Sequence, residues 1–250
     1  MAIILAAGTG VRLRAVHSER PKGFVEVGGG PIIARSVAAL RRAGVREFVF
    51  VVGWRGSVYR SWCATECPGA LCVENVDFAT TGSLRSLVLG CAVVPGRKVV
   101  VVESDLLFEQ RAPDCLLAAA TENTVLLSDF TDSRDEVWAY AQADDPTRLR
   151  FLTKTKSMIE REPVGELVGL SLFSETLVEQ LGVAARALPP TAHYEDGLNA
   201  VSSALPVSLL RVPGLVWCEI DDPQHLARAR EAVWPRVVDA EARYDLTQVC

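Results

Sequence analysis

Short apolar runs alternate with helical patterns through the first half of the chain, and this alternation is what most constrains the fold. Continuous apolar runs without polar interruption are typical of strands that are buried on both faces. Such strands separated by helices predict a parallel sheet with helices on both sides. The expected strands are 2–7, 47–52, 71–75, 98–104 and 124–130, and the expected helices lie near 31–43, Tyr59, 83–94 and 113–121.

The pattern changes after about residue 135. Two expected antiparallel strands flank a turn-rich DDPT segment, and further strands and helices follow up to a last helix from Pro223 to about Ala240. These strands are expected at 137–142, 148–154, 167–173, 207–212 and 215–220, and the helices near 174–186 and 194–204. We therefore predict an α/β fold: a Rossmann-like, mostly parallel mixed sheet with helices on both faces and a small antiparallel subregion. With no repeat and no linker, residues 1–250 are expected to form one domain, with halves at about 1–135 and 136–240.

Charge and hydropathy exclude several classes of protein. The 250 residues carry a net charge of −5 with no run of Lys and Arg, so nucleic-acid binding is not expected. No apolar stretch reaches the length of a membrane span, and no signal peptide is evident, so a cytoplasmic location is expected. Cys63, Cys67 and Cys72 are too few for a zinc site and are interpreted as small buried hydrophobic residues, although their role stays open.

A loop of small residues follows the first expected strand. Backbone N–H groups of such a loop can approach a polyphosphate closely, and Arg12 and Lys22 add two cations. Leu13 stands where a dinucleotide-binding loop needs its third glycine, and the Gly-Lys-Ser/Thr of a P-loop is absent. The residues expected to contact a nucleotide here are Leu5, Ala6, Ala7, Gly8, Thr9, Gly10, Arg12 and Lys22.

The segments LAAGTGVRL and PKGFVEVGG resemble the signature of the sugar-phosphate type of nucleotidyltransferases. The molybdenum-cofactor guanylyltransferases have a similar loop, but their lysine follows the arginine more closely. The ten-position spacing of Arg12 and Lys22 is similar to that of the sugar-phosphate and choline-phosphate branches. The resemblance implies a nucleotidyltransferase that takes the nucleoside triphosphate on this loop, with Arg12 and Lys22 as catalytic cations.

Two aspartates follow expected strands, and the resemblance assigns them to Mg²⁺. Asp105 ends VVVVESD, and Asp221 ends the segment Trp217-Cys218-Glu219-Ile220-Asp221. Carboxylates and phosphate oxygens are the ligands that Mg²⁺ prefers. Asp105 could instead cap a loop, and Asp222 is expected to cap the last helix. Glu103 is the weaker candidate, because it is expected to point to the other side of the strand.

The segment Asn75–Leu87 resembles a stretch of the choline-phosphate and 2-aminoethylphosphonate cytidylyltransferases. The resemblance makes Thr81 and Ser83 candidates for the pyrimidine or ribose. The departure at Thr81-Gly82 leaves the base contact in doubt, and Ser83 could instead cap the helix that follows.

Acceptor contacts are expected in the second half. Lys154 or Lys156 follows a strand, as a lysine of the family does, and Lys154 is favoured because it ends the strand. Tyr194-Glu195-Asp196 resembles an element of the same branch. With Trp138 it could form a pocket, part aromatic and part acidic, for an ammonium head, although Tyr194 in the core and an acidic helix start would explain it equally.

The combined hypothesis is a Mg²⁺-dependent cytidylyltransferase. It would transfer CMP from CTP to a small phosphonate or phosphate ester, such as 2-aminoethylphosphonate, hydroxyethylphosphonate or phosphocholine, and release pyrophosphate. Arg12, Lys22 and Lys154 would be the catalytic residues, and a homodimer is one option for the assembly. The alternatives are a sugar-1-phosphate or inositol-phosphate nucleotidyltransferase and, more remotely, a non-catalytic nucleotide-binding regulatory module.

Overall fold

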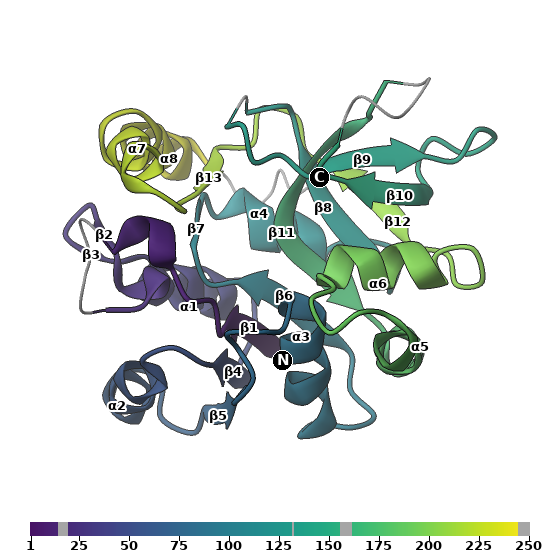
Figure 1. The fold of residues 1–250 in the computed structure, drawn as a ribbon. Helices are drawn as coiled ribbons and strands as arrows, with labels where there is room; N and C mark the ends of the chain where they lie inside the picture. Colours follow the sequence, from purple (N-terminus) through teal and green to yellow (C-terminus); the bar gives the residue numbers. More distant parts are fainter. Residues whose placement is uncertain (15–19, 132, 156–161, 245–250) are drawn as a thin grey trace.

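A central sheet organises the molecule in a computed structural model that describes residues 1–14, 20–131, 133–155 and 162–244 (Figure 1). Its path is β10-β9-β11-β6-β1-β4-β5, with β8 beside β11 and β12 beside β8. The strands are β1 Ala2–Ala6, β4 Phe48–Val52, β5 Leu71–Glu74, β6 Val99–Glu103, β8 Thr124–Ser128, β9 Trp138–Ala141, β10 Leu149–Thr153, β11 Gly165–Phe173 and β12 Ser208–Arg211.

Strand direction divides the sheet into two regions. β1 pairs in parallel with β4 and β6, and β4 pairs in parallel with β5. β11 runs antiparallel to β6, β8 and β9, and β9 and β10 are antiparallel to each other. The parallel strands therefore end at one edge of the sheet, where ligands bind in folds of this type. This arrangement confirms the predicted mixed sheet with its antiparallel part.

Alternate residues of the buried strands fill two cores, one on each face of the sheet. On one face, Ile4 and Phe50 pack in a cluster with residues of α1, α2 and α4. On the other face, Ile3 and Val49 pack with residues of α3, α5 and α6. The helices are α1 Ile32–Arg42, α2 Gly56–Glu66, α3 Ser83–Ala92, α4 Arg111–Leu117, α5 Glu175–Ala187 and α6 Tyr194–Val201. Because both faces are covered, the strands read as continuous apolar runs.

Two short, two-stranded sheets lie outside the main sheet. The apolar pattern of the sequence predicts only one of their strands. β13 (Trp217–Glu219) pairs with β7 (Leu106–Phe108), and β2 (Glu26–Val27) pairs with β3 (Gly30–Pro31). The C-terminal helical segment then comprises α7 (Pro223–Arg228), a π-helical turn (229–233) and α8 (Trp234–Arg243). The single long helix expected there is therefore interrupted, and the Pro235 ring, which cannot donate an N–H, follows the interruption.

The C-terminal helical segment packs against α1 and the β2–β3 hairpin. The guanidinium of Arg35 lies 3.8 Å from the centre of the Trp234 ring. Arg230 Nε donates a hydrogen bond of 3.0 Å to the carbonyl of Glu26. Gly28 has φ +59° at this contact, and a Cβ added there would stand 2.1 Å from an atom of the Trp234 ring. The hairpin can therefore approach the helix only with glycine at position 28.

In the part of the chain that the structure describes, cysteines pack in or against the hydrophobic core. Cys63 and Cys67 are buried in the core on the α2 side, and Cys72 packs partly buried against it. All three are free thiols. Among the described residues, no helix is both long and apolar enough to span a bilayer.

Gly28→Ala and Gly29→Ala form a matched pair that tests the contact with Trp234. Both glycines have positive φ, but nothing lies within 4 Å of a Cβ at position 29. Gly29→Ala should cost about 1 kcal/mol of unfolding free energy through backbone strain alone. Gly28→Ala should cost about 2 kcal/mol more, because the Trp234 ring must move. Urea unfolding measures both values, and equal losses would refute the contact.

Candidate active site

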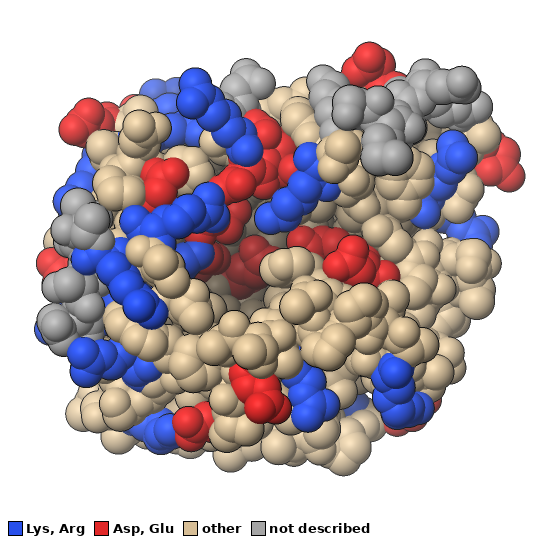
Figure 2. Space-filling view, viewed as in Figure 1, with Lys and Arg blue, Asp and Glu red and all other residues tan. Residues whose placement is uncertain are grey.

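A cavity of about 300 Å³ opens at the carboxyl ends of the parallel strands. It receives residues from the ends of β1 and β6, from the start of α3, from β11 and from β13. Figure 2 shows this hollow with acidic side chains at its floor and basic side chains around it. The site therefore lies where the fold predicts a ligand, in a mixed electrostatic environment.

The loop after β1 forms one wall of the cavity. Leu5, Ala6, Ala7 and Gly8 line it, and a Cβ at Gly8 would meet nothing within 4 Å, so the backbone here is open to a ligand. Gly10 has φ +58°, and a Cβ there would lie 3.1 Å from Lys22 Cγ. The glycine thus lets the lysine pass close to the loop. Thr9 does not line the cavity among the described residues, and its carbonyl accepts a hydrogen bond of 3.1 Å from Arg14.

Lys22 is the central cation of the site. Its ammonium donates to Asp105 Oδ2 at 3.0 Å and also to Asp221 Oδ1. Arg12 donates to Asp221 Oδ2 and, at 2.7 Å, to Asp135 Oδ2. The structure therefore brings Arg12, Lys22, Asp105 and Asp221 together, although they are spread over more than 200 positions of the sequence.

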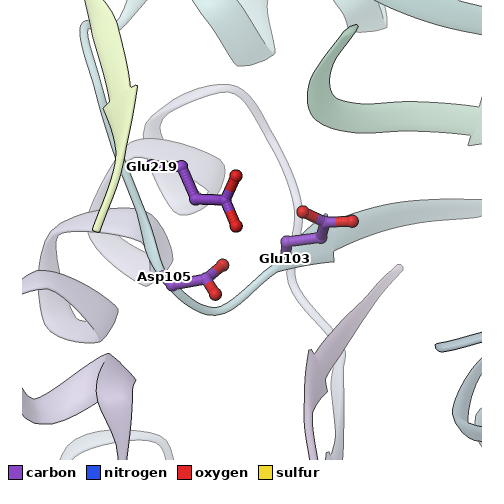
Figure 3. Close-up of side chains that lie close together, drawn as sticks. All are labelled: Glu103, Asp105 and Glu219. Carbon is purple, nitrogen blue, oxygen red and sulfur yellow. The ribbon is translucent and has the colours of Figure 1, made fainter. Parts of the chain in front are cut away.

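Three carboxylates form a cluster on the floor of the cavity. Glu103, Asp105 and Glu219 each offer an oxygen, and these atoms lie within 4.8 Å of one another (Figure 3). The prediction that Glu103 points to the other side of the strand is therefore wrong. Residues two positions apart on a strand point to the same side, so Glu103 at the end of β6 lies on the side of Asp105, which follows in the turn. Glu219, the last residue of β13, was not singled out from the sequence, although it stands two residues before Asp221.

Burial and mutual repulsion act on these acids. Burial, followed by the charges of Glu195, Glu219 and Asp105, raises the pKa of Glu103 well above its usual range. Burial, followed by the charge of Asp105, raises the pKa of Glu219 to about 7, while Lys22 and Lys154 oppose that shift. Such a crowded set of carboxylates favours any cation that enters the cavity.

The two aspartates that follow β13 have different partners. Asp221 is only 4% exposed and pairs with Lys22 and Arg12. Asp222 is the N-cap of α7, and its Oδ1 accepts hydrogen bonds of 2.8 Å from the backbone N–H groups of Gln224 and His225. The capping expected for Asp222 is therefore confirmed.

Thr81 and Ser83 line the cavity but also hold local structure. Thr81 Oγ1 donates to the carbonyl of Asp77 at 2.9 Å and accepts from Asn75 at 3.0 Å. Ser83 is the first residue of α3 rather than its cap, which is Gly82, so the capping alternative is wrong. Its Oγ accepts a hydrogen bond of 3.0 Å from the backbone N–H of Tyr194, which ties α3 to α6.

The residues predicted to bind the acceptor separate into two groups. Lys154 and Glu195 line the cavity. Trp138 and Tyr194 are not among the described lining residues: the Trp138 ring lies 5.0 Å from that of Phe130, and Tyr194 is completely buried. Asp196 is exposed and accepts from the backbone N–H of His193 in a capping box. Lys156 lies outside the described residues.

Comparison with known proteins identifies the family. A model of the MobA-like NTP transferase domain matches residues 2–192. The chain belongs to this family. It is 31% identical over 233 residues to the 2-aminoethylphosphonate cytidylyltransferase of Lancefieldella rimae, and the match covers 90% of each chain. It is 30% identical over 248 residues to the CMP-5'-(3-aminopropyl)phosphonate synthase of Streptomyces rubellomurinus, covering 89% of this chain and 37% of that protein.

The comparisons also show how much of each related protein this chain covers. The chain spans about half or less of the length of several curated relatives that it matches. The solved inositol-1-phosphate CTP transferase of T. maritima has a TM-score of 0.80 and 21% identity, over 98% of this chain and 97% of that one. The CTP:phosphocholine cytidylyltransferase of Streptococcus pneumoniae has a TM-score of 0.75 and 22% identity, over 92% and 97%. These structures confirm the fold, and the family match confirms the predicted nucleotidyltransferase class of enzyme.

Glu166 should give the chain a measurable pH dependence of stability. Its carboxylate accepts hydrogen bonds from Thr131 N at 2.7 Å and Thr131 Oγ1 at 3.0 Å, but burial raises its pKa to about 7. An unfolded glutamate titrates near pH ~4.3. Between these two values the folded state keeps a proton that the unfolded state releases, so stability falls as the pH rises.

Urea unfolding at pH 5 and pH 8 tests this contribution. Glu166→Gln should lose less unfolding free energy between these pH values than the wild type does. Glu179→Gln, which changes an exposed glutamate of α5, should keep the wild-type dependence. The assignment is wrong if Glu166→Gln and the wild type lose the same amount.

Proposed function

We propose that this protein transfers CMP from CTP to a small phosphonate or phosphate ester and releases pyrophosphate. The observation that carries the proposal is the Lys22 ammonium held between Asp105 and Asp221, beside the open loop that follows β1. The relatives named for cytidylyl transfer to aminoalkylphosphonates support the choice of CTP and of a phosphonate.

The nucleotide is expected on the β1 side of the cavity. Ala7 and Gly8 present an open backbone, Arg12 and Lys22 supply positive charge for the triphosphate, and Thr81 and Ser83 lie at the start of α3. An anionic triphosphate would compete with the aspartates for both cations, so we expect Lys22 and Arg12 to exchange part of their ion pairs for phosphate oxygens.

The carboxylates at the cavity floor fit a divalent cation. The carboxylate oxygens of Glu103, Asp105 and Glu219 lie within 4.8 Å of one another, and Mg²⁺ prefers oxygen ligands of this kind. We propose that Asp105 and Asp221, which Lys22 joins, hold Mg²⁺, with Glu219 in the same cluster as Asp105. Bound there, Mg²⁺ would stabilise negative charge on the α-phosphate.

The proposed reaction is a single in-line displacement. An acceptor oxygen forms a bond to the α-phosphorus of CTP, and the bond from that phosphorus to the bridging oxygen breaks, so pyrophosphate leaves with the electron pair. The acceptor oxygen is anionic near neutral pH, so no side chain has to remove a proton. Lys154 would hold the acceptor, while Lys22 and Arg12 would balance the charge on the leaving pyrophosphate.

A sugar-1-phosphate or inositol-phosphate nucleotidyltransferase is the second candidate. A bifunctional IPC transferase and DIPP synthase of Rubrobacter xylanophilus is 28% identical over 93% of this chain, which spans 51% of that protein. The acidic floor favours a cationic acceptor over a neutral polyol, so we rank this candidate second. A regulatory module without activity would need neither the clustered carboxylates nor the Lys22 bridge.

Pyrophosphate release tests the proposed function directly. The purified chain, assayed with Mg²⁺ and each of the four nucleoside triphosphates, should release pyrophosphate with CTP only when a small phosphonate or phosphate ester is present. The acceptor set should include 2-aminoethylphosphonate, hydroxyethylphosphonate, phosphocholine, glucose-1-phosphate and inositol-1-phosphate. Turnover only with the last two would favour the second candidate, and no turnover with any pair would contradict both.

Neighbouring aspartates provide a matched test of the metal assignment. Asp105→Asn and Asp221→Asn should each lower kcat by at least about 100-fold, because charge stabilisation at the α-phosphate is lost. Asp222→Asn should keep near-normal kcat, since asparagine is an equally good N-cap for α7. Circular dichroism would verify that all three variants fold. Near-normal kcat in either of the first two would remove that residue from the metal site.

A further inference from the structure

Tyr59 of α2 belongs both to the core and to the wall of the cavity. Its side chain is completely buried and packs in the core on the α2 side of the sheet. It also lines the cavity, together with Lys22 and Asp105. The packing of the core can therefore act on the site through this residue.

The ring and the hydroxyl of Tyr59 contact the turn that carries Lys22. Lys22–Phe24 form a 3₁₀ turn, and the Phe24 ring lies edge-on to the Tyr59 ring with 4.9 Å between the ring centres. A Cβ added at Gly23 would stand 2.5 Å from Tyr59 Oη, closer than real Cβ contacts come. Glycine at this position therefore lets the backbone next to Lys22 pass directly against the hydroxyl.

The same hydroxyl lies beside the turn that carries Asp105. The Cβ position at Gly23 that would meet Tyr59 Oη is also 3.2 Å from the carbonyl oxygen of Ser104. Ser104 directly precedes Asp105, whose carboxylate accepts a hydrogen bond of 3.0 Å from the Lys22 ammonium. Tyr59 Oη therefore lies where the two backbone segments that carry this ion pair come together.

The Tyr59 hydroxyl is expected to destabilise the fold. Its oxygen is buried and has no hydrogen-bond partner among the described residues. Burial raises the pKa of Tyr59 above its usual range, so the hydroxyl stays protonated and uncharged near neutral pH. A buried hydroxyl without a partner costs free energy that a phenylalanine, with the same ring, would not. The oxygen atom at this place therefore indicates a role in the site rather than in folding.

We propose that Tyr59 is a positioning residue, whose hydroxyl is a spacer that sets how far the Lys22–Gly23 segment stands from the Ser104–Asp105 turn. This inference rests on the proposed function, in which Lys22 binds the triphosphate and Asp105 holds Mg²⁺. Without the oxygen atom the two segments can move toward each other, and the ammonium and the carboxylate lose their alignment with the substrate. A displacement of about 1 Å in such a group can lower the rate about 100-fold.

Tyr59→Phe tests the spacer with the ring kept in place. We expect kcat for pyrophosphate release to fall about tenfold and the Mg²⁺ concentration for half-maximal activity to rise about tenfold. The KM for the acceptor should not change, because Lys154, which is proposed to hold it, follows β10 and not the Lys22 turn. The melting temperature should stay equal or rise, because an unpaired hydroxyl is removed. A lower melting temperature with an unchanged Mg²⁺ requirement would assign Tyr59 a structural role only and overturn the inference.

Tyr140→Phe is the matched control. Tyr140 on β9 is also buried, its hydroxyl also lacks a partner among the described residues, and its ring stacks on that of Phe151 at 4.7 Å. It does not belong to the described lining of the cavity. This variant should therefore keep the wild-type kcat and Mg²⁺ requirement. Equal losses in both variants would assign the effect of Tyr59→Phe to core packing, which also overturns the inference.

A second substitution tests the contact itself. Gly23→Ala places a methyl group against Tyr59 Oη and should lower both kcat and the melting temperature. In combination with Tyr59→Phe the methyl group can occupy the place of the oxygen atom. The double variant should therefore have a higher kcat and a higher melting temperature than Gly23→Ala alone. Losses in kcat that simply multiply, without any recovery, would refute the contact of the hydroxyl with the Lys22 turn.

A binding measurement separates this inference from the proposed function. Calorimetry of the full chain with Mg²⁺ would use a CTP analogue that has a methylene group between the α- and β-phosphorus. Weaker binding of the analogue to Tyr59→Phe than to the wild type, with no turnover of CTP by either, supports the inference and contradicts the proposed function. Turnover by the wild type, with the same kcat, Mg²⁺ requirement and affinity in Tyr59→Phe, overturns the inference alone. A wild type that does not bind the analogue contradicts both.

Discussion

The Lys22 ammonium between Asp105 and Asp221 is the interaction on which the rest of the site depends. It joins the loop after β1, the end of β6 and the segment after β13, three parts of the chain that are remote in sequence. Two carboxylates this close would repel each other without a cation between them. The same arrangement holds the two aspartates at the cavity and keeps a positive charge where a triphosphate can reach it.

The fold delivers these groups because parallel strands end at a common edge. β1 lies between β4 and β6, so the glycine loop and Asp105 emerge side by side. Asp221 is positioned by a separate short sheet. β13 pairs with β7, which directly follows the turn at Asp105, and Ile220 N donates a hydrogen bond of 2.9 Å to the carbonyl of Asp105. The contact of Trp234 with Gly28 then fastens the C-terminal helices to the hairpin that follows Lys22.

The sequence predicted what depends on long, regular elements. The apolar runs locate the strands of the main sheet, and the position of Asp105 directly after such a run is enough to place it at the ligand edge. Short elements escaped prediction: β7 has three residues and β2 and β3 have two each, too few for a periodic pattern. Glu219 was missed although β13 lies within the strand expected at 215–220, because only the pairing of β13 with the unpredicted β7 brings Glu219 beside Glu103 and Asp105.

The residues expected to bind the acceptor show a second limit of prediction from the sequence. Tyr194, Glu195 and Asp196 are predicted together because they resemble one element of the family, but consecutive residues of a helix point in directions about 100° apart. Only one of them can then face a given cavity: Tyr194 enters the core, Glu195 faces the cavity and Asp196 caps the helix. Glu103 shows a different error: residues two positions apart share one side of a strand, so its spacing from Asp105 already favoured the same side.

The structure shows where part of the net charge of −5 is located. Part of the acidic excess is concentrated at the cavity floor, where the proposed divalent cation would offset it. The most direct measurement of the central claim is ³¹P NMR of the protein with CTP, Mg²⁺ and 2-aminoethylphosphonate. The account predicts that the resonances of a new phosphonate–phosphate anhydride grow in step with pyrophosphate. Unchanged CTP and phosphonate resonances, or CMP without the anhydride, would contradict it.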